Sequence, residues 1–289
     1  MRARDGHDSG QGGTLNEPLR ARGWRKVALA AWPRPHDPTT YGVLELDATP
    51  ALRYLDALRE NHGAAVTMLA LVVKALAHAM AEEPSATRVY RWGRLCSRES
   101  TDVFVHVDRE GRDLSGFKLE NVPGKPLLAL ASEISERSGA VRKASSPERL
   151  RRSTAVTDAL PSFLMPLALR IQDLIAHDWG WDVPALGIFR DPFGAALVTN
   201  VGSLGLDLAF PPLPPIGRAS IVVALGRVRL KPWVVDGEVQ ARPVLTLGVT
   251  MDHRMLDGAQ ASRLARSFAA ALEDPAGAFG PDGEGGESL

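Results

Sequence analysis

The stretch from Leu245 to Gly258 constrains the fold more than any other part of the chain. Its first half alternates large apolar residues with small or polar ones as far as Met251, which predicts a β-strand with one buried face. After Gly258 apolar residues recur at helical spacing until Asp274-Pro275 ends the segment. His253 is therefore predicted to lie at the exit of a strand, just before a helix. A rigid strand fixes a side chain there while the loop keeps it accessible, which favours a functional residue.

Two residues of this stretch have both a functional and a purely structural interpretation. Asp257 can cap the following helix, with Gln260 three residues later in a capping-box relation, and such a cap needs no catalytic role. His253 can be a base, because histidine as a residue type titrates near neutral pH, or it can be an ordinary residue of a surface turn. Spacing alone leaves both interpretations open.

Composition narrows the class of protein. The 289 residues are 45% hydrophobic, enough to bury a sizeable core. The 34 basic and 34 acidic side chains leave no net charge, so we expect neither nucleic acid nor a membrane as partner, and a small molecule fits better. The single cysteine, Cys96, excludes an intrachain disulfide and a cysteine metal cluster. We expect a cytoplasmic protein with no bound metal.

The two ends of the sequence differ from the part between them. Residues 1–22 are rich in Arg, Gly, Asp and Ser without an apolar run, and residues 280–289 are similar. Such segments bury too little apolar surface to offset their ordering entropy, so both are predicted to be disordered tails. The folded part is then a single domain over residues 23–279.

Local patterns predict several elements of this domain. A strand is expected over 41–46, followed by a helix that Thr49 caps and in which Pro50 takes the first position. A second helix, over 68–80, starts from a Thr67 cap and is apolar on most sides. We therefore expect this second helix at the centre of the core.

The middle of the chain gives a hairpin and an apolar run. Alternation over 101–108 and 114–119, across a turn-like segment, predicts the β-hairpin, with His106 as a solvated or satisfied strand residue opposite the valine face. A helix is expected from Pro126. The apolar run 160–169 is too short to span a membrane. It is interpreted either as a lid or oligomer contact, or as a buried helix pair kinked by proline.

The order of short motifs in the second half points to a known family. The chain resembles the catalytic domain of 2-oxo acid dehydrogenase dihydrolipoyl acyltransferases, which shares its fold with chloramphenicol acetyltransferase. The resemblance covers about 23–279 and is strongest over 194–275. It is carried by Arg25-Lys26, Thr199-Asn200-Val201-Gly202, Leu225-Gly226-Arg227-Val228, Val235-Asp236-Gly237, Arg242-Pro243, Asp252-His253-Arg254-Met255-Leu256-Asp257-Gly258 and Leu272-Glu273-Asp274-Pro275.

The resemblance implies a fold and an assembly. The fold is an α/β two-layer sandwich in which helices cover a mixed β-sheet. The assembly is a homotrimer, or a multiple of trimers, with active sites between subunits. The substrates are coenzyme A or dihydrolipoamide and an acyl thioester, and a lipoylated protein acting in trans is a candidate partner.

The same resemblance assigns roles to residues of this sequence. His253 is the base that takes the proton from the attacking thiol, and Thr199 is the hydroxyl donor to the oxyanion. Asp257 is a structural acid held by Arg25. Three further residues of the matched motifs are placed in supporting positions: Asn200, Gly202 and Gly258.

This sequence departs from the family pattern at three points. No lipoyl domain precedes residue 23, so no covalently bound lipoate is expected in this chain. Threonine stands at position 199 where serine is usual, and residues 157–193 look like extra sequence. The leading hypothesis is a stand-alone coenzyme A-dependent acyltransferase. The alternative is a non-catalytic trimeric scaffold or regulatory relative.

Overall fold

The computed structural model describes residues 37–63, 65–108, 114–143, 161, 163–214 and 217–285. From Pro38 onward the chain forms one compact unit. The first 36 residues lie outside the described part, so the predicted N-terminal tail, the domain start at residue 23 and the position of Arg25 stay predictions.

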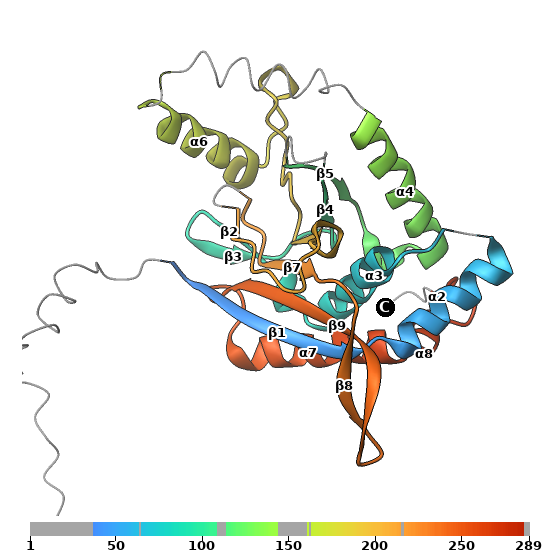
Figure 1. Ribbon diagram of the computed structural model, residues 1–289. Coiled ribbons are helices and arrows are strands. Elements are labelled where there is room, and N and C mark those ends of the chain that lie inside the picture. The colour runs from blue at the N-terminus through green and yellow to red at the C-terminus, as the bar shows by residue number, and fades with distance from the viewer. Residues whose placement is uncertain are drawn as a thin grey trace, which may run out of the picture. The chain divides into compact units, whose positions relative to one another are not determined.

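A mixed sheet forms the centre of the molecule (Figure 1). Its strand order is β1-β9-β7-β6-β4-β5, with β8 paired to the outer half of β9. The strands β4, β6 and β7 run parallel to one another, and the other pairs are antiparallel. The strands are β1 (Thr39–Asp47), β4 (Val103–Asp108), β5 (Leu114–Leu119), β6 (Ala196–Asn200), β7 (Ile221–Leu225), β8 (Arg229–Val235) and β9 (Glu238–Asp252). A separate small hairpin joins β2 (Val89–Arg91) to β3 (Arg94–Cys96).

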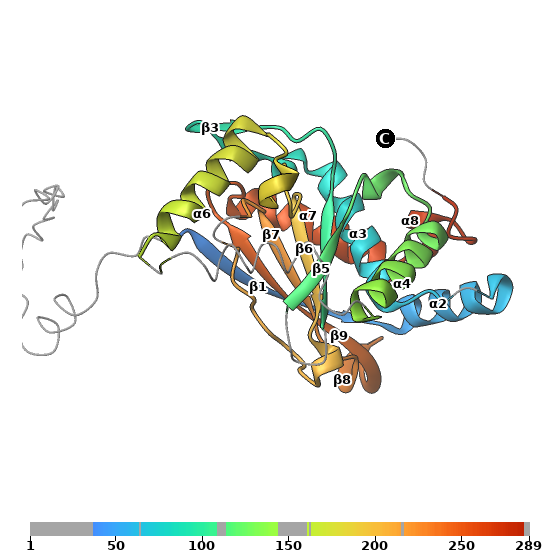
Figure 2. The ribbon, with the colours of Figure 1, turned by 90° about the horizontal axis from the view of Figure 1, so that it is seen from above.

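The helices of the main core cover one face of this sheet. Figure 2 shows α3 and α4 on one side of the strands and α6 on the other. The α-helices are α2 (Thr49–His62), α3 (Met68–Glu82), α4 (Leu127–Lys143), α6 (Met165–Asp173), α7 (Gly258–Glu273) and α8 (Pro275–Phe279). Shorter helical turns are η1 (Pro84–Thr87), η2 (Val122–Gly124), η3 (Leu174–Trp179), η4 (Pro184–Leu186) and η5 (Gly202–Leu204). The predicted two-layer α/β fold with a mixed sheet is confirmed.

Strand alternation assigns each residue to one of the two faces. In β4 the valines enter the main core under the helices, while Phe104 packs on the opposite face with Leu197 and Val222. The predicted hairpin of β4 and β5 is confirmed.

The helix α3 is the central helix of the core, as its sequence predicts. Every residue from Ala70 to Ala77 is buried, and the Thr67 hydroxyl accepts the Ala70 N–H at 3.3 Å as the expected cap. Truncating a leucine such as Leu71, which is fully buried, to alanine would cost about 2–5 kcal/mol of folding free energy.

The start of α2 differs from the prediction by one position. Ala48 is the N-cap, Thr49 is already helical and Pro50 follows it. The reason is Asp47 at the end of β1, whose carboxylate accepts hydrogen bonds from both the Thr49 N–H and its hydroxyl. Thr49 therefore donates to a preceding carboxylate and does not cap the helix.

Residues 280–285, which the sequence analysis assigns to the C-terminal tail, pack against the domain. The Tyr54 hydroxyl donates to the Gly280 carbonyl at 2.8 Å, and the Leu127 N–H at the start of α4 donates to the Gly283 carbonyl at 2.8 Å. These carbonyls satisfy a buried tyrosine and a helix N-terminus, so backbone hydrogen bonding places a segment poor in apolar side chains. Residues 286–289 lie outside the described part.

The apolar run 160–169 does not form a buried helix pair, so that alternative is wrong. Pro166 lies in the first turn of α6, where proline begins a helix without kinking it. No residue of α6 is buried, and Phe163 and Leu167 are 79% and 56% exposed. No helix within the described ranges is long and apolar enough to cross a membrane.

Candidate functional site

His253 is the first residue after β9, as predicted, and its neighbours fix the turn around it. The His253 N–H donates to the Pro38 carbonyl at 2.9 Å. Asp252 is buried and accepts hydrogen bonds from the Arg254 backbone and guanidinium, while Met255 is buried on the other side of the turn. The His253 side chain is exposed. An anchored turn thus presents an imidazole to the surface.

Asp257 is the N-cap of α7, which confirms the structural interpretation of this residue. Its carboxylate accepts the Gln260 N–H at 2.8 Å, and the Gln260 side chain accepts the Asp257 N–H at 2.9 Å. Gly258 is the first helical residue and is exposed. The predicted ion pair between Asp257 and Arg25 involves a residue outside the described part and stays a prediction.

Thr199 lies near the end of β6, half-buried on the face opposite the main core. In the sheet it pairs with His106 on one side and Ala224 on the other. The next strand contributes Gly248, where a Cβ would lie 2.0 Å from the Ala209 carbonyl oxygen. The chain around Ala209, which follows Thr199 in sequence, therefore folds back over this face and packs directly on the backbone of β9 at Gly248.

Asn200 and Gly202 hold the loop that follows Thr199. The Asn200 side chain accepts the Ser203 N–H at 3.2 Å. A Cβ at Gly202 would lie 2.9 Å from the Arg227 backbone nitrogen, so only glycine lets the two loops approach. Both residues shape the backbone after Thr199, and their supporting role in the site stays a prediction.

One chain does not bring Thr199 and His253 together. Thr199 pairs with Ala224, and Ala224 pairs with Gly248. His253 follows Gly248 by five residues along the extended strand, a displacement of roughly 17 Å. The two residues therefore lie at opposite ends of the central strands.

The sequence predicts His106 as an ordinary strand residue, but its surroundings in the structure are unusual. Burial lowers the pKa of its imidazole, which a hydrogen bond with the Ser115 backbone partly offsets, and Nδ1 is buried with no hydrogen-bond partner among the described residues. Its ring packs edge-on against Phe104 at 5.1 Å between centroids. The signal in the sequence was a histidine within the alternating strand, but its position beside Thr199 depends on sheet register.

A cluster of ionic side chains was also missed. Arg218 donates to the carboxylates of Asp173 and Asp178, at 2.5 and 2.7 Å, and thereby ties α6 and η3 to the core. His177, fully buried between these elements, lies 3.0 Å from Asp173, and burial lowers its pKa. Within the described ranges, no group of three or more His, Cys, Asp or Glu is placed to hold a metal ion.

Comparison with known proteins finds relatives among the acyltransferase components of 2-oxo acid dehydrogenase complexes. The family model for the 2-oxoacid dehydrogenases acyltransferase catalytic domain matches residues 194–279. A probable dihydrolipoyllysine-residue succinyltransferase component of the mitochondrial 2-oxoglutarate dehydrogenase complex, from Schizosaccharomyces pombe, is 25% identical over 240 residues, 82% of this chain and 44% of that protein. The dihydrolipoyllysine-residue acetyltransferase component of the pyruvate dehydrogenase complex from Bacillus subtilis is 38% identical over 80 residues, 27% of this chain and 17% of that protein.

Solved structures extend the likeness to most of the domain. A probable dihydrolipoamide acetyltransferase from Listeria monocytogenes superposes with a TM-score of 0.60 at 19% identity, covering 90% of this chain and 95% of that one. The Azotobacter vinelandii dihydrolipoamide acetyltransferase gives 0.61 at 20% identity, covering 84% of each chain. This chain spans less than half the length of the two curated relatives above. It therefore carries the sequence signature of the 2-oxoacid dehydrogenase acyltransferase catalytic domain over residues 194–279 and has the fold of that domain over most of its length.

Proposed function

We propose that this chain is a coenzyme A-dependent acyltransferase whose active site forms between two copies. One copy supplies His253 as the general base, and its neighbour supplies Thr199 as the oxyanion donor. The observation that carries the proposal is the separation of these residues. Both lie within the stretch that matches an acyltransferase family model, yet they stand at opposite ends of the sheet in a single chain.

A general base is needed because the nucleophile is a thiol. A free thiol titrates near 8.5, so it is mostly protonated at neutral pH, whereas the reactive species is the thiolate. His253 takes the thiol proton, and the sulfur attacks the thioester carbonyl. The tetrahedral intermediate then expels the second thiolate, to which His253 returns the proton. An exposed side chain on an anchored turn suits this role, because a thiol from outside can reach it.

The hydroxyl of Thr199 acts on the oxygen of the same intermediate. As a donor in a site closed by the neighbouring copy, it stabilises negative charge that appears only during reaction. Its neighbour on β7 is the small residue Ala224, while the chain around Ala209 packs on Gly248 one strand further away.

A relative supports the pairing of His253 with Asp257. A serine, a histidine and an asparagine have been investigated for their role in the catalytic mechanism of the Azotobacter vinelandii enzyme, and the last two stand four positions apart there. His253 and Asp257 have the same spacing. In this chain the carboxylate caps α7, so we assign Asp257 to holding the turn and not to moving the proton.

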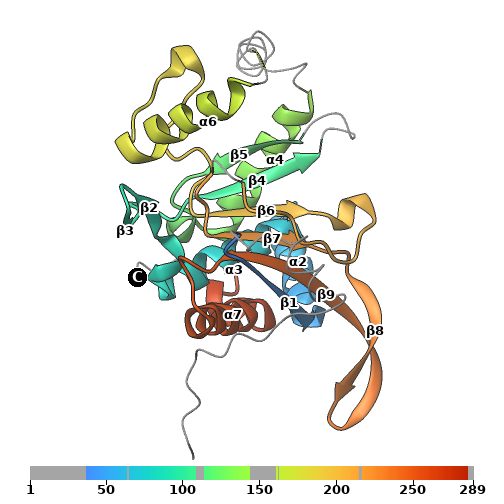
Figure 3. The same cartoon turned by 90° about the vertical axis from the view of Figure 1, so that its left-hand side faces the viewer.

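Self-association is supported by the surface at the Thr199 end of the sheet. The hairpin of β8 and β9 extends away from the body of the domain (Figure 3). It exposes Leu230, Val234 and Val239 at 76%, 66% and 72%, more apolar surface than a free hairpin in water favours. A structure with a TM-score of 0.60 to this chain is the cubic core of a pyruvate dehydrogenase multienzyme complex. We propose a trimer or a multiple of trimers, in the cytoplasm, with a lipoylated protein as a candidate partner in trans.

The test is subunit complementation. Thiol release is measured with a panel of acyl-coenzyme A donors for wild type, His253→Ala, Thr199→Val and an equal mixture of the two variants dissociated and reassembled together. Each variant alone should be nearly inactive. The mixture should recover about a quarter of wild-type activity, since each site draws its threonine and its histidine from different copies at random.

Each alternative gives a different result. A mixture that stays as inactive as its components would exclude the shared site. A wild-type assembly that transfers no acyl group with any donor would favour the non-catalytic scaffold.

A further inference from the structure

His106 stands beside Thr199 on the face of the sheet opposite the main core. The two residues pair in the register of the parallel strands β4 and β6. Two positions earlier in each strand, Phe104 and Leu197 pack in the small apolar cluster on that face, so strand alternation puts the imidazole and the hydroxyl there as well. The His106 side chain is therefore the neighbour of Thr199 on β4.

Aromatic side chains support the His106 ring. The Phe104 ring packs edge-on against it, with 5.1 Å between centroids, and lies 5.0 Å from the Phe193 ring. A Cβ at Gly116, which pairs with His106 on β5, would collide with the Phe104 ring, so glycine at this position makes room for that ring. The imidazole thus forms a wall that has an apolar surface behind it.

The space next to Thr199 is limited on both sides. Beyond Ala224, the chain around Ala209 lies directly on Gly248 of β9. Toward β4, neighbouring strands are roughly 4.8 Å apart, and carbon atoms in contact need about 3.5–4.0 Å. A chain that extends from the Thr199 hydroxyl toward β4 therefore meets the imidazole within its first few carbon atoms.

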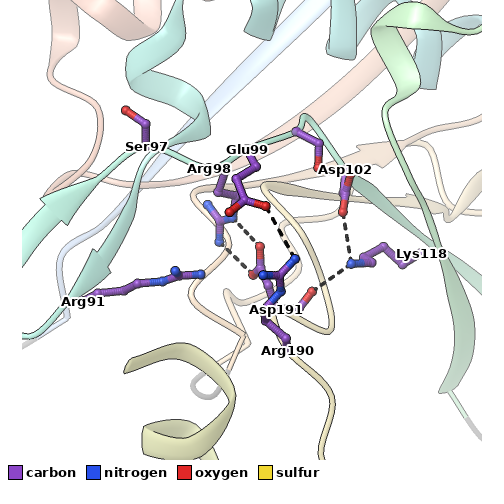
Figure 4. A pocket seen from close by; sticks show the side chains of 9 residues that line it. Arg91, Ser97, Arg98, Glu99, Asp102, Lys118, Arg190 and Asp191 are labelled. Atoms are coloured by element: carbon purple, nitrogen blue, oxygen red, sulfur yellow. Dashed lines mark hydrogen bonds and ion pairs between the residues drawn. The ribbon is translucent and has the colours of Figure 1, made fainter. Parts of the chain in front are cut away.

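The charges around this wall do not favour an anionic group. Burial lowers the pKa of His106 below its ordinary value, so the ring is neutral at neutral pH. Four basic side chains that border this face in the described part of the chain already contact carboxylates: Lys118 with Asp102 (Figure 4), Lys231 with Glu45, and Arg227 and Arg229 with Asp207. A terminal carboxylate on an acyl group would find no free cation among these four.

We propose that His106 determines the acyl specificity of the site, because it admits only a short, uncharged acyl group between its imidazole and the Thr199 hydroxyl. The inference rests on the proposed function, which puts the carbonyl oxygen of the intermediate at Thr199. The acyl chain, and not the thiol arm, faces His106, since the aromatic surface behind the imidazole favours an alkyl group over a polar arm. His106 itself takes no part in the proton transfer.

The experiment compares acyl donors within one enzyme preparation. Steady-state assays with dihydrolipoamide as the acceptor give kcat/KM for acetyl-, hexanoyl- and succinyl-coenzyme A with wild type, His106→Ala and His106→Arg. His78→Ala, which removes a partly exposed histidine of α3, is the control. Ratios between donors do not depend on the folded fraction, so a loss of stability in a variant cannot imitate a change of specificity.

Wild type should use the acetyl donor at least about tenfold better than the other two. His106→Ala should raise the hexanoyl-to-acetyl ratio about tenfold because it opens space, and His106→Arg should raise the succinyl-to-acetyl ratio similarly because it supplies a cation. The KM for dihydrolipoamide should not change, and His78→Ala should keep the wild-type ratios. An unchanged ratio in either His106 variant, or a wild type that prefers the hexanoyl or succinyl donor, overturns the inference.

A binding measurement separates this inference from the proposed function. Calorimetry gives the Kd for acetyl- and hexanoyl-coenzyme A with His253→Ala, which should not consume the donor, and with the double variant that also carries His106→Ala. A preference for the acetyl donor that disappears in the double variant supports the inference even if wild type transfers no acyl group, in which case the proposed function alone fails. The same preference in both variants overturns the inference.

Discussion

The Arg254 guanidinium lies 2.6 Å from the buried carboxylate of Asp252, and the two residues flank His253 on either side. The ion pair closes the turn beneath the histidine, so the imidazole points outward from a backbone that cannot easily rearrange. Asp252 is also bonded to the start of β7 through the Ser220 carbonyl. The position of the proposed base is thus set by the sheet.

Replacing the base should abolish most of the activity. His253→Ala should lower kcat for acyl transfer by about a hundredfold or more, because the thiol then loses its proton only to water. Circular dichroism and the urea midpoint should stay at wild-type values, since the side chain is exposed. His62→Ala, a partly exposed histidine on α2, serves as the control and should keep full activity. A folded His253→Ala variant with an unchanged rate would exclude the mechanism.

Thr199 should act through its hydroxyl. Thr199→Val removes the donor at similar volume and should lower kcat by roughly a hundredfold with little change in KM, because a preorganised oxyanion donor is worth about 2.7–4 kcal/mol in the transition state. Thr199→Ser keeps the donor and should keep most of the activity. Equal activity of the two variants in one steady-state assay would show that Thr199 only fills space.

Local chemistry explains what the sequence could predict. The capping box of Asp257 and Gln260 and the Thr67 cap depend on residues three positions apart, and both form as expected. The apolar alternation before His253 places it at a strand end without any tertiary information.

Contacts between residues far apart in the sequence explain what the sequence could not predict. The separation of Thr199 from His253 depends on the register of β6, β7 and β9, which no local pattern encodes. The carbonyls of Gly280 and Gly283 accept hydrogen bonds from Tyr54 and Leu127, which lie far away in sequence. The small pocket lined by Arg91, Arg98, Lys118 and Asp191 brings together four separate stretches of chain in the same way.

Arg218 should be the main link between the core and the segment of α6 and η3. Its side chain is 17% exposed and bonds both Asp173 and Asp178. Arg218→Ala leaves two carboxylates without their cation, so it should lower the free energy of unfolding by about 3 kcal/mol. Urea denaturation measures the loss. Arg229→Ala, which breaks an exposed pair with Asp207, is the matched control and should leave stability unchanged.

His177 should make the protein less stable in mild acid. Burial lowers the pKa of His177 below its ordinary value, although Asp191 and Asp173 act in the opposite direction and Arg218 and Arg98 add to the lowering. The unfolded chain therefore binds a proton more readily than the folded one. The stabilisation is complete above the unfolded pKa of about 6.5 and is lost as pH falls below it.

The effect is measured by urea unfolding at two pH values, 7.5 and 5.5, chosen as about one unit on either side of the ordinary histidine pKa. Hydrogen bonds from Arg218 hold the pKa of Asp178 below its usual range, so that carboxylate stays ionised at both values. His177→Gln should lose less stability than wild type on acidification, because its side chain cannot take up a proton. The remaining loss should fall further in a double variant with His106→Gln, since burial also lowers the pKa of His106. An identical loss in wild type and His177→Gln would show that protonation of His177 does not control acid stability.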